Sequence, residues 1–354
     1  MLDTLFSADP DSGSGHLFET LKKSPKRIVF TDGEDIRVLR AAEILVGKEL
    51  VAPILLGSRE RVYALAEKHG VSMQFINVID PERSTDLPMF EERLERVEKF
   101  RGRVISNARE MICNPHNFGA MMVQYGQADG MVAGNKSLPA SIFRAVSNFI
   151  KPLEDVPSLF GVVVMVAPTL NHMGSTGMLF LADCGMNPEP NVDQLASFGV
   201  VTGKFASRII GKKPKVAFLS HSTQGCMSTP SSQKMAAATS LAVHQVGKES
   251  LALTVVGEVQ ADVALDPQAA EIKSMGENTS TSDVLVFPGL DAAHIGFKLL
   301  QHVGGARHFG QLILGLTRPA AQVPRTTSVE TLLGTAILVG VEAVKGREVQ
   351  HEWE

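Results

Sequence analysis

Short hydrophobic runs alternate with longer amphipathic segments along the chain, and this alternation predicts the fold. In the first half, four runs bounded by turn-forming or charged residues are typical of buried strands: 27–30, 50–57, 76–80 and 130–134. The segments between them carry hydrophobic residues every three or four positions, which predicts helices over 36–46 and 58–70, the second with Ser58 as N-cap. Residues 90–112 predict a charged amphipathic helix that breaks or bends near Gly102.

The second half repeats the pattern. Four further hydrophobic runs predict strands: 161–166, 178–183, 215–220 and 283–288. A long helix is predicted over 192–210, where Asn191 and Gln194 have the spacing of a capping box, and another over 292–303. Strands that alternate with helices in this way favour parallel sheets covered by helices on both faces, so the predicted fold class is α/β.

Length and composition narrow the class of protein. A chain of 354 residues exceeds one ordinary hydrophobic core, so two domains are expected. A net charge of −4 and an aromatic content of 6% argue against a binding surface for DNA or RNA. No hydrophobic run approaches the roughly 20 residues that span a bilayer. Residues 1–16 fit neither a signal peptide nor a transit peptide, which favours the cytoplasm, and residues 8–15 indicate a flexible arm.

The cysteines and histidines carry no metal-binding signature. Cys113, Cys184 and Cys226 are far apart and form no CxxC motif, which is typical of reduced thiols in the cytosol. The ten histidines form no HExxH or HxxxH pair. There is also no GxGxxG motif after a strand and no P-loop. The sequence therefore predicts no metal ion and no nicotinamide cofactor.

Candidate chemistry lies in loops that follow strands, because α/β sheets bind ligands at the carboxyl ends of their strands. The loops of interest are 133–137, 220–225, 288–293 and 324–328. The loop 220–225, SHSTQG, offers hydroxyl and N–H groups that suit phosphate or carbonyl oxygens. It is equally typical of a polar turn that satisfies its own backbone, and both interpretations stand.

The segment 323–331, VPRTTSVET, places one arginine before a nearly uncharged stretch, 332–344. Thr327 and Glu330 have the spacing of a capping box at a helix start. An arginine beside a helix N-terminus suits a phosphate or carboxylate, because both offer positive charge and N–H donors. The alternative is that Arg325 is a surface residue before an ordinary helix.

Eight stretches of the chain resemble the phosphate acetyl/butyryltransferase family. The first four are DGEDIRVLRAAEIL (32–45), ADGMVAG (128–134), FLADCGMNPEPNVDQLA (180–196) and PKVAFLSHSTQG (214–225). The others are GEVQADVAL (257–265), VLVFPGLDAAHIGFKLLQHVGGA (284–306), GLTRP (315–319) and RTTSVE (325–330). They occur in the family's order over nearly the whole chain, from about residue 27 to 345, and the series is specific although no single stretch is decisive.

The resemblance implies a fold and an activity. The fold is two α/β/α sandwich domains, each with a mostly parallel sheet, and a cleft between them. The first domain would comprise residues 1–154 plus 311–354, with 1–25 as a flexible N-terminal arm, and the second 155–310. The activity is the exchange of acetyl phosphate and coenzyme A for acetyl-CoA and inorganic phosphate. Coenzyme A is then a substrate, no cofactor or covalent acyl-enzyme is needed, and a homodimer is expected.

The resemblance also implies roles for particular residues. Arg325 and Arg144 match the family's phosphate-binding arginines, and Thr331 occupies the place of its general-base aspartate. Threonine does not titrate near neutral pH, so it cannot take the thiol proton as a carboxylate does. Residues that could replace the aspartate are His221, His294, Glu330 and Asp291. Candidate substrate-binding residues are Asn135, Ser222, Thr223, Asp291 and Thr327.

The chain departs from the family's pattern elsewhere too. Pro324 replaces a serine, and Thr326 and Thr327 replace a Gly-Cys pair. A third arginine of the family falls on Glu98, with Arg96 and Arg101 nearby. These departures leave open a second function, a catalytically weak relative that binds acetyl-CoA or acyl phosphate as a sensor or oligomerisation module. A dehydrogenase of the isocitrate type would need metal-binding aspartates and a nucleotide loop, and neither is found in the sequence.

Overall fold

The computed structural model of the protein describes residues 15–100, 102, 104–166, 174, 176–274 and 280–351. The chain divides into two compact units. Unit 1 comprises Met1–Leu17 and Leu153–Gly315, and unit 2 comprises Phe18–Pro152 and Leu316–Glu354. The two ends of the described chain therefore contribute mainly to one unit, and the middle of the chain forms the other.

Unit 2 is built on a parallel sheet with the strand order β3-β2-β1-β4-β11. The strands are β1 (Lys26–Phe30), β2 (Val51–Leu56), β3 (Asn77–Ile79), β4 (Gly130–Ala133) and β11 (Ala320–Gln322). Strand β1 is central, and its Phe30 aligns with Leu55 of β2 and Val132 of β4. Because these strands are parallel, the chain leaves β1, β4 and β11 at the same edge of the sheet.

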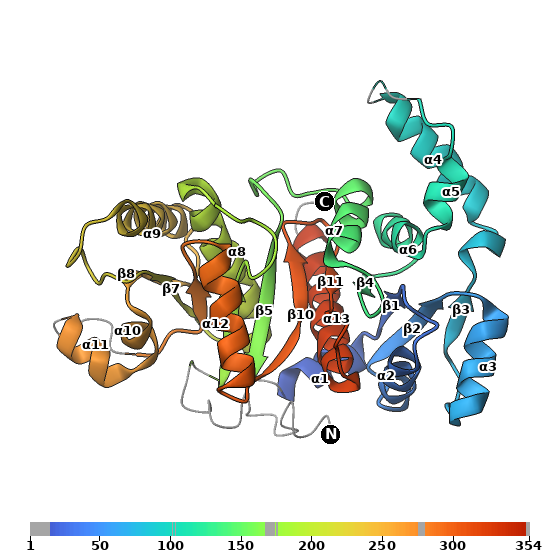
Figure 1. Ribbon diagram of the computed structural model, residues 1–354, viewed down its shortest axis with the longest axis horizontal. Helices are drawn as coiled ribbons and strands as arrows, with labels where there is room; N and C mark the ends of the chain where they lie inside the picture. Colours follow the sequence, from blue (N-terminus) through green and yellow to red (C-terminus); the bar gives the residue numbers. More distant parts are fainter. Residues whose placement is uncertain are drawn as a thin grey trace. The chain divides into compact units, whose positions relative to one another are not determined.

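Helices cover both faces of the unit 2 sheet. Figure 1 shows α6 and α7 over one face and α2 and α13 over the other. The helices of this unit are α2 (Ile36–Gly47), α3 (Arg59–His69), α4 (Leu87–Phe100), α5 (Ala108–Cys113), α6 (Pro115–Gln124), α7 (Pro139–Phe149) and α13 (Val329–His351), with a short 3₁₀ turn η2 (Pro81–Arg83). Helix α13 packs so closely on the sheet that a Cβ on Gly130 would lie 2.4 Å from Val339.

The amino-terminal segment differs from its prediction. Residues 15–23 form helix α1 (Gly15–Lys23), in which Leu17 and Leu21 are fully buried. Leu21 lies against Gly340 of α13, where an added Cβ would approach its side chain to 3.0 Å. The expectation of a flexible arm over residues 1–25 is therefore wrong for this helix, because its leucines have an apolar surface to cover. Residues 1–14 lie outside the described residues.

Unit 1 is built on a mixed sheet with the strand order β10-β5-β6-β9-β7-β8. The strands are β5 (Phe160–Val166), β6 (Met178–Ala182), β7 (Lys215–Leu219), β8 (Thr254–Val259), β9 (Val284–Val286) and β10 (Arg307–Leu314). Strand β5 runs antiparallel to both β6 and β10, whereas β6, β9, β7 and β8 run parallel. The link between β5 and β6 is too short for a crossover helix, so these strands pair antiparallel.

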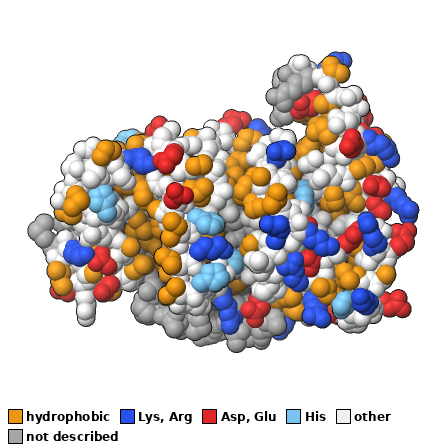
Figure 2. Space-filling view, in the orientation of Figure 1, with side chains coloured by type: hydrophobic (Ala, Val, Ile, Leu, Met, Phe, Trp, Pro, Cys, Tyr) orange, Lys and Arg blue, Asp and Glu red, His pale blue; other side chains and the backbone are white. Residues whose placement is uncertain are grey.

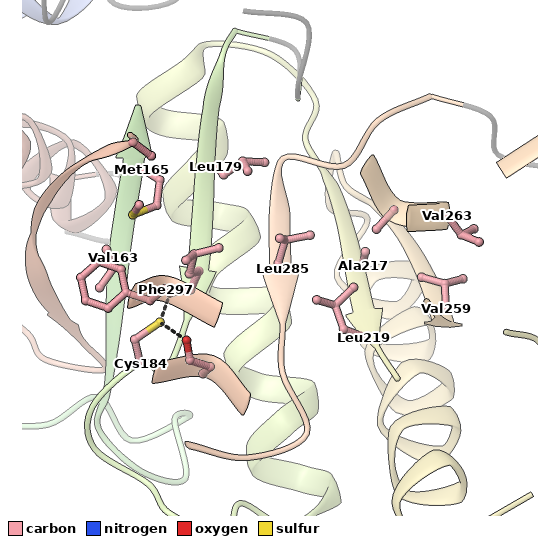
Figure 3. Close-up of a cluster of buried hydrophobic side chains, with 14 of the residues drawn as sticks. Val163, Met165, Leu179, Cys184, Ala217, Leu219, Val259, Val263, Leu285 and Phe297 are labelled. Carbon is pink, nitrogen blue, oxygen red and sulfur yellow. Dashed lines mark hydrogen bonds between the residues drawn. The ribbon is translucent and has the colours of Figure 1, made fainter. Parts of the chain in front are cut away.

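Unit 1 also has helices on both faces of its sheet. Figure 1 shows α8 and α9 over one face and α10 to α12 over the other. Their bounds are α8 (Val192–Ile210), α9 (Pro230–Lys248), α10 (Ala261–Leu265), α11 (Pro267–Lys273) and α12 (Leu290–His302). Under α8, the rings of Phe160 and Phe198 stack with centroids 4.4 Å apart. On the opposite face, Figure 3 shows Val163, Leu285 and Phe297 in one buried cluster with Cys184.

The predicted fold class is confirmed. Both sheets are mostly parallel and are covered by helices on both faces, as the alternating pattern indicated. Both halves of the predicted capping box at Asn191 and Gln194 are present at the start of α8. The predicted break near Gly102 separates α4 from α5. Among the described helices, none combines the length and hydropathy that a membrane span requires.

Candidate active site at the carboxyl edge of the unit 2 sheet

Three loops meet where β1, β4 and β11 end. They are residues 31–35, 134–138 and 323–328, and we call them the edge loops. Strand β4 pairs with both β1 and β11, which brings the loops together. Gly134 has φ +122°, and a Cβ at this position would lie 2.2 Å from the carbonyl oxygen of Val323. Two of the edge loops therefore touch through their backbones, at a point where no larger residue fits.

A buried carboxylate holds the loop after β4. Asp32 lies in the loop after β1, and its Oδ2 accepts hydrogen bonds from the backbone N–H groups of Gly134 (2.8 Å) and Asn135 (3.0 Å). Hydrogen bonds to an ionised acceptor are stronger than those between neutral groups. Asp32 therefore fixes the path of this loop and uses only main-chain donors to do so.

Arg37 ties the loops after β4 and β11 together. It lies at the start of α2 and pairs with Asp35, the N-cap residue of that helix, at 2.7 Å. Its Nη1 donates to the carbonyl oxygens of Arg325 (2.8 Å) and Thr327 (2.9 Å), and its Nη2 donates to that of Asn135 (3.1 Å). The fork geometry of a guanidinium suits several acceptors at once. One side chain thus fixes the backbone on both sides of Arg325.

The charges of Asp35 and Arg37 stabilise each other. Burial opposes ionisation of the Asp35 carboxyl, but hydrogen bonds and the charge of Arg37 outweigh it, and the pKa of Asp35 is lowered. The hydrogen bond that Arg37 donates to the Asp35 carboxylate in turn raises the pKa of Arg37. Both groups are therefore ionised at neutral pH, and the pair acts as a permanent clamp.

Asn135 and Thr327 are predicted substrate-binding residues, and each carries a buried polar atom that has no hydrogen-bond partner among the described residues. Both residues are less than 5% exposed, and the unpartnered atoms are Asn135 Nδ2 and Thr327 Oγ1. Leaving such an atom unpaired costs about 1–3 kcal/mol. The main-chain atoms of both residues are held by Arg37 and Asp32. Their side chains thus remain available to a ligand that supplies the complementary donor or acceptor.

The three predicted catalytic residues also lie in unit 2. Arg325 is exposed on the loop after β11, and no partner of its guanidinium is recorded within the described part of the chain. Arg144 lies on the exposed face of α7. Thr331 is buried in the first turn of α13. The structure thus brings the backbones of Arg325, Thr327 and Asn135 together around Arg37. Thr331 follows Thr327 by four residues, in the first turn of α13.

The cap of α13 differs from its prediction. Ser328, not Thr327, caps this helix, because its Oγ accepts from the backbone N–H of Thr331 at 3.1 Å and its hydroxyl lies 3.2 Å from Thr331 Oγ1. The backbone N–H of Thr327 is used in a turn to the carbonyl of Pro324. The predicted capping box of Thr327 and Glu330 is therefore wrong, since the turn delays the helix by one residue.

Ser222 and Thr223 lie in unit 1, in the loop after β7. The Ser222 hydroxyl donates to the buried carboxylate of Glu258 at 3.0 Å and accepts from the N–H of Met227 at 3.1 Å. Thr223 Oγ1 accepts from the N–H of Gln260 at 3.0 Å. Both side chains are buried. In this loop the polar-turn interpretation describes the observed bonds of Ser222, whose donor and acceptor are both in use.

Asp291 lies at the start of α12, beside a cleft of unit 1. The cleft has a volume of about 430 Å³ and is also lined by Glu189, Ser231 and Lys234. Lys234 donates to the carbonyl of Pro288 at 2.8 Å. Asp291 is exposed and lies in the first turn of the helix. This cleft offers both signs of charge next to the helix starts of α9 and α12.

The remaining predicted residues lie outside the three edge loops. His221 and His294 lie in unit 1 and bond within it, His221 to Thr229 and His294 to the carbonyl of Cys184. Glu330 is half-buried in the first turn of α13. Around the family's third arginine, Glu98 is buried and Arg96 pairs with Glu92. Arg101 lies outside the described residues.

Sequence reasoning missed His116. It is the second residue of α6, where Asn114 is the N-cap and Pro115 follows. Asn-Pro is a common helix start, and it could have predicted the start of this helix. Its Nδ1 lies 2.8 Å from Thr31 Oγ1 and its Nε2 lies 2.7 Å from Ser137 Oγ, so it joins two edge loops. Burial lowers the pKa of His116, and the nearby charge of Asp32 opposes this shift.

Fold and site together define a class: an α/β protein in which loops after parallel strands present arginine and unpaired polar groups, the chemistry that binds phosphate or carboxylate. The family model described as phosphate acetyl/butaryl transferase matches residues 14–339. The chain therefore belongs to the phosphate acetyl/butaryl transferase family.

Particular relatives agree with this assignment. The phosphate acetyltransferase of Acetivibrio thermocellus is 32% identical over 328 residues, which cover 92% of this chain and 97% of that protein. The structure resembles the EutD phosphotransacetylase of Staphylococcus aureus, with a TM-score of 0.83 and 31% identity over 94% of this chain and 99% of that one. It also resembles a phosphotransacetylase of Streptococcus pyogenes, with a TM-score of 0.83 and 32% identity over 94% and 98% of the two chains.

Proposed function

We propose that the protein is a phosphate acyltransferase that interconverts acetyl phosphate and coenzyme A with acetyl-CoA and inorganic phosphate. The observation that carries this proposal is the set of edge loops, in which one guanidinium, that of Arg37, holds the backbones of Arg325, Thr327 and Asn135. The chain belongs to a family of acyl transferases, and relatives matched over most of their length are named phosphate acetyltransferases. Their names give no support to the alternative of a sensor or oligomerisation module.

In this proposal, Arg325 binds the phosphate group of acetyl phosphate. Its guanidinium is exposed, and the clamp of Arg37 on the carbonyls of Arg325 and Thr327 limits the backbone motion of the loop. A preorganised cation lowers the barrier because it need not reorient as charge develops on the transferring group. Arg144 is assigned the second cation, which offsets charge on the phosphate from α7.

Asn135 and Thr327 complete the substrate site. The Asn135 amide is a donor for a phosphate or carbonyl oxygen, and the Thr327 hydroxyl can donate or accept. Holding the acyl phosphate and the thiol in attacking geometry contributes several kcal/mol, since well-oriented intramolecular reactions gain about 7–11 kcal/mol. Thr223 and Asp291 are assigned to coenzyme A, which is a substrate and not a resident cofactor. Ser222 shapes the loop that carries Thr223.

The transfer itself needs no metal in this proposal. The sulfur of coenzyme A attacks the acyl carbon, the C–S bond forms, and the bond from that carbon to the phosphate oxygen breaks. The thiol proton must leave, and Thr331 is no proton acceptor. A thiol with a pKa near that of cysteine, about 8.5, is a few per cent ionised at pH 7. Unassisted ionisation would therefore limit the rate by roughly 30-fold, and general-base catalysis typically contributes about 100-fold or more.

We also propose a homodimer in the cytoplasm. Ile295, Leu299 and Val303 are each more than half exposed and follow one another at helical spacing along α12. Figure 2 shows this hydrophobic run on the surface over α12. Such a stripe supports burial against a second copy of the chain. The predicted domains, 1–154 plus 311–354 and 155–310, belong to the same proposal, and the division into units 1 and 2 supports them.

The proposed activity is tested with purified protein, acetyl phosphate and coenzyme A, by following thioester absorbance. Turnover well above a reaction without enzyme is expected, and propionyl and butyryl phosphate measured alongside give the acyl preference. Arg325→Ala is the matched negative control. No turnover with any acyl phosphate, by protein shown to be folded, would overturn the proposal. Binding of acetyl-CoA without turnover would instead favour the sensor.

A further inference from the structure

The edge loops contain a hydroxyl and an imidazole that could handle the thiol proton. Ser137 lies in the loop after β4, and its Oγ is 2.7 Å from Nε2 of His116. The other ring nitrogen, Nδ1, lies 2.8 Å from Oγ1 of Thr31, at the end of β1. A hydroxyl, a base within hydrogen-bond reach and a third group that orients the base form the arrangement that activates a hydroxyl for chemistry.

This trio lies near the residues proposed to bind phosphate. The carbonyl oxygens of Asn135 and Arg325 accept hydrogen bonds from the same guanidinium, that of Arg37, at 3.1 and 2.8 Å. Ser137 follows Asn135 by two residues, a separation of at most about 7 Å along an extended chain. The acyl carbon of an acyl phosphate is separated from phosphorus by a single bridging oxygen. Arg325 and Ser137 therefore lie on two loops whose backbones are held by the same guanidinium, and a phosphate on Arg325 would bind at this edge of the sheet.

The environment of His116 keeps the ring neutral, the form that accepts a proton. The ring is buried, and burial lowers the pKa of His116. Its position in the first turn of α6 acts in the same direction, because a helix N-terminus disfavours a cation. Asp32, in the loop after β1, opposes this shift. Lys136, in the loop after β4, is directed to the carbonyl of Glu34 instead.

Both ring nitrogens face hydroxyl groups, so either of them can carry the hydrogen. If Nδ1–H donates to Thr31 Oγ1, then Nε2 carries the lone pair that faces the Ser137 hydroxyl. Ser137 is half-buried, and in this tautomer its hydroxyl donates to the Nε2 lone pair. The neutral ring can then accept a proton through Ser137.

We propose that Ser137 and His116 form a proton relay for the thiol of coenzyme A, in place of the carboxylate that Thr331 lacks. The inference rests on the proposed acyl transfer. The thiol proton passes to Ser137 Oγ as the serine's own proton passes to His116 Nε2, and the freed sulfur electron pair forms the C–S bond. The bond between the acyl carbon and the phosphate oxygen breaks, and its electron pair leaves with phosphate. The imidazolium then returns its proton to the phosphate or to water.

The competing interpretation is a structural histidine satisfied by two hydroxyls. A structural role predicts that His116→Gln lowers stability and changes activity only through loss of folded protein. The relay predicts a loss of kcat in fully folded protein, and a loss that depends on pH. The two interpretations are therefore separated by the pH profile of the folded variants and not by the size of the defect alone.

The test uses the full chain with His116→Gln, Ser137→Ala and His69→Gln. His69 is an exposed histidine at the end of α3 in the same unit and serves as the matched control. With acetyl phosphate and coenzyme A at pH 7, His116→Gln and Ser137→Ala should each lower kcat about 100-fold, as expected for loss of a general base. KM for acetyl phosphate should stay within about threefold, and His69→Gln should behave as the unchanged protein.

The pH profile provides the second readout. As pH rises toward the thiol pKa, coenzyme A ionises without help, so the defect of His116→Gln should shrink. Adding Thr331→Asp to His116→Gln should restore at least tenfold in kcat, because it supplies a carboxylate where the family has one. A defect that is constant across pH and is not rescued would assign His116 a structural role and overturn the relay.

The failure of this inference differs from failure of the proposed function. If the unchanged protein transfers acetyl groups and His116→Gln is equally active in folded protein, the relay is overturned and the acyltransferase stands. If the unchanged protein shows no transfer, the acyltransferase and the relay both fall. Circular dichroism on each variant shows that the compared proteins are folded.

Discussion

Asp32 of unit 2 and Glu258 of unit 1 are buried carboxylates that each hold a polar loop after a strand, and they do so differently. In unit 2, Asp32 accepts from the backbone N–H groups of Gly134 and Asn135. In unit 1, Glu258 accepts from the N–H of Gly225 and from the side-chain hydroxyl of Ser222. The unit 2 loop is held by its main chain, and the Asn135 amide remains unpaired. The unit 1 loop uses its own hydroxyl to keep its shape.

The difference shows how a polar loop can be held in place while its side chains keep unpaired polar atoms. Composition alone does not distinguish the two loops, since both contain glycine and small polar residues after a parallel strand. What distinguishes them is which atoms satisfy the carboxylate. Where main-chain groups do so, the side chains are free for a ligand, and where side chains do so, the loop is complete without one.

The largest expected effect is at Arg325. Arg325→Ala should lower kcat/KM for acetyl phosphate about 1,000-fold, because it removes a preorganised cation from the transferring phosphate. Stability should change little, since the side chain is exposed. Arg325→Lys should recover only part of the activity, because lysine keeps the charge but not the fork of donors. Steady-state kinetics and urea unfolding of both variants check this, and an Arg325→Ala protein with near-normal kcat/KM would contradict it.

Arg37 should have the next largest effect. Arg37→Ala removes the clamp on the carbonyls of Asn135, Arg325 and Thr327, and we expect a loss of about 100-fold in kcat/KM. The control is Arg27→Ala, since Arg27 pairs with Asp129 and donates to the carbonyl of Gly126 beside the opposite end of β1. Hydrogen bonds of this kind each contribute about 1.5–3 kcal/mol, so both variants should lose stability.

Arg37→Ala should lose activity in folded protein, and the control Arg27→Ala should not. Kinetics under conditions where both remain folded, with unfolding curves for each, make the comparison. Equal activity losses for Arg27→Ala and Arg37→Ala would show that Arg37 acts only through stability.

Ser222 should affect stability more than activity. Ser222→Ala leaves the Glu258 carboxylate with one fewer donor and should lower the free energy of unfolding by about 1–3 kcal/mol. KM for coenzyme A should stay within about threefold, because the hydroxyl is already used within the loop. Ser240→Ala, on the exposed side of α9, is the control, with an expected change below about 0.5 kcal/mol. A large rise in KM without loss of stability would place Ser222 in the substrate site.

The last prediction concerns pH dependence through a second buried histidine, His308 of unit 1. Burial lowers its pKa to about 4, with Lys298 and His302 acting in the same direction, and its Nε2 has no hydrogen-bond partner in the described structure. The neutral ring is favoured in the folded state, so its stabilisation is present above about pH 6.5 and is lost as pH falls toward 4.

We therefore expect the free energy of unfolding to fall by about 1–3 kcal/mol between pH 7 and pH 4 through this group, at 1.36 kcal/mol per pKa unit. His308→Phe should flatten that part of the curve, because the ring still packs near Phe297 but cannot titrate. Urea unfolding at several pH values measures this. Parallel curves for the two proteins would show that His308 does not contribute.

The sequence predicted many of the regular elements of this fold, although β8, β10 and the long helix α9 were missed. Runs such as 27–30 and 215–220 became β1 and β7, because buried strands need little beyond continuous apolar residues. Strand β11, Ala320–Gln322, was missed because its three small or polar residues carry no such signal. The antiparallel direction of β5 was also missed, since hydrophobic pattern does not encode strand direction.

Arg325, the charged residue of the candidate site, could be predicted from the sequence. The residues that hold its loop in place could not. Arg325 stood out as a charge before an uncharged helix. Arg37 and Asp32 did not, because acids and arginines near a helix start usually serve the helix alone. Their role depends on hydrogen bonds across about 100 residues or more of sequence, as between Asp32 and Asn135 or Arg37 and Thr327. His116 was missed for the same reason.

The contact between Gly134 and Val323 has a consequence for how this site can change over time. A side chain at residue 134 would collide with the carbonyl of Val323 at 2.2 Å, so this position is closed to ordinary substitution. Arg37 and Asp32 act on main-chain carbonyl and N–H groups, and every amino acid except proline supplies both. Positions 324, 326 and 331 can therefore mutate without loosening the loops. The backbones of the edge loops are held rigidly, while the side chains at these positions can be substituted. A new proton acceptor can therefore be acquired before or after the old one is lost.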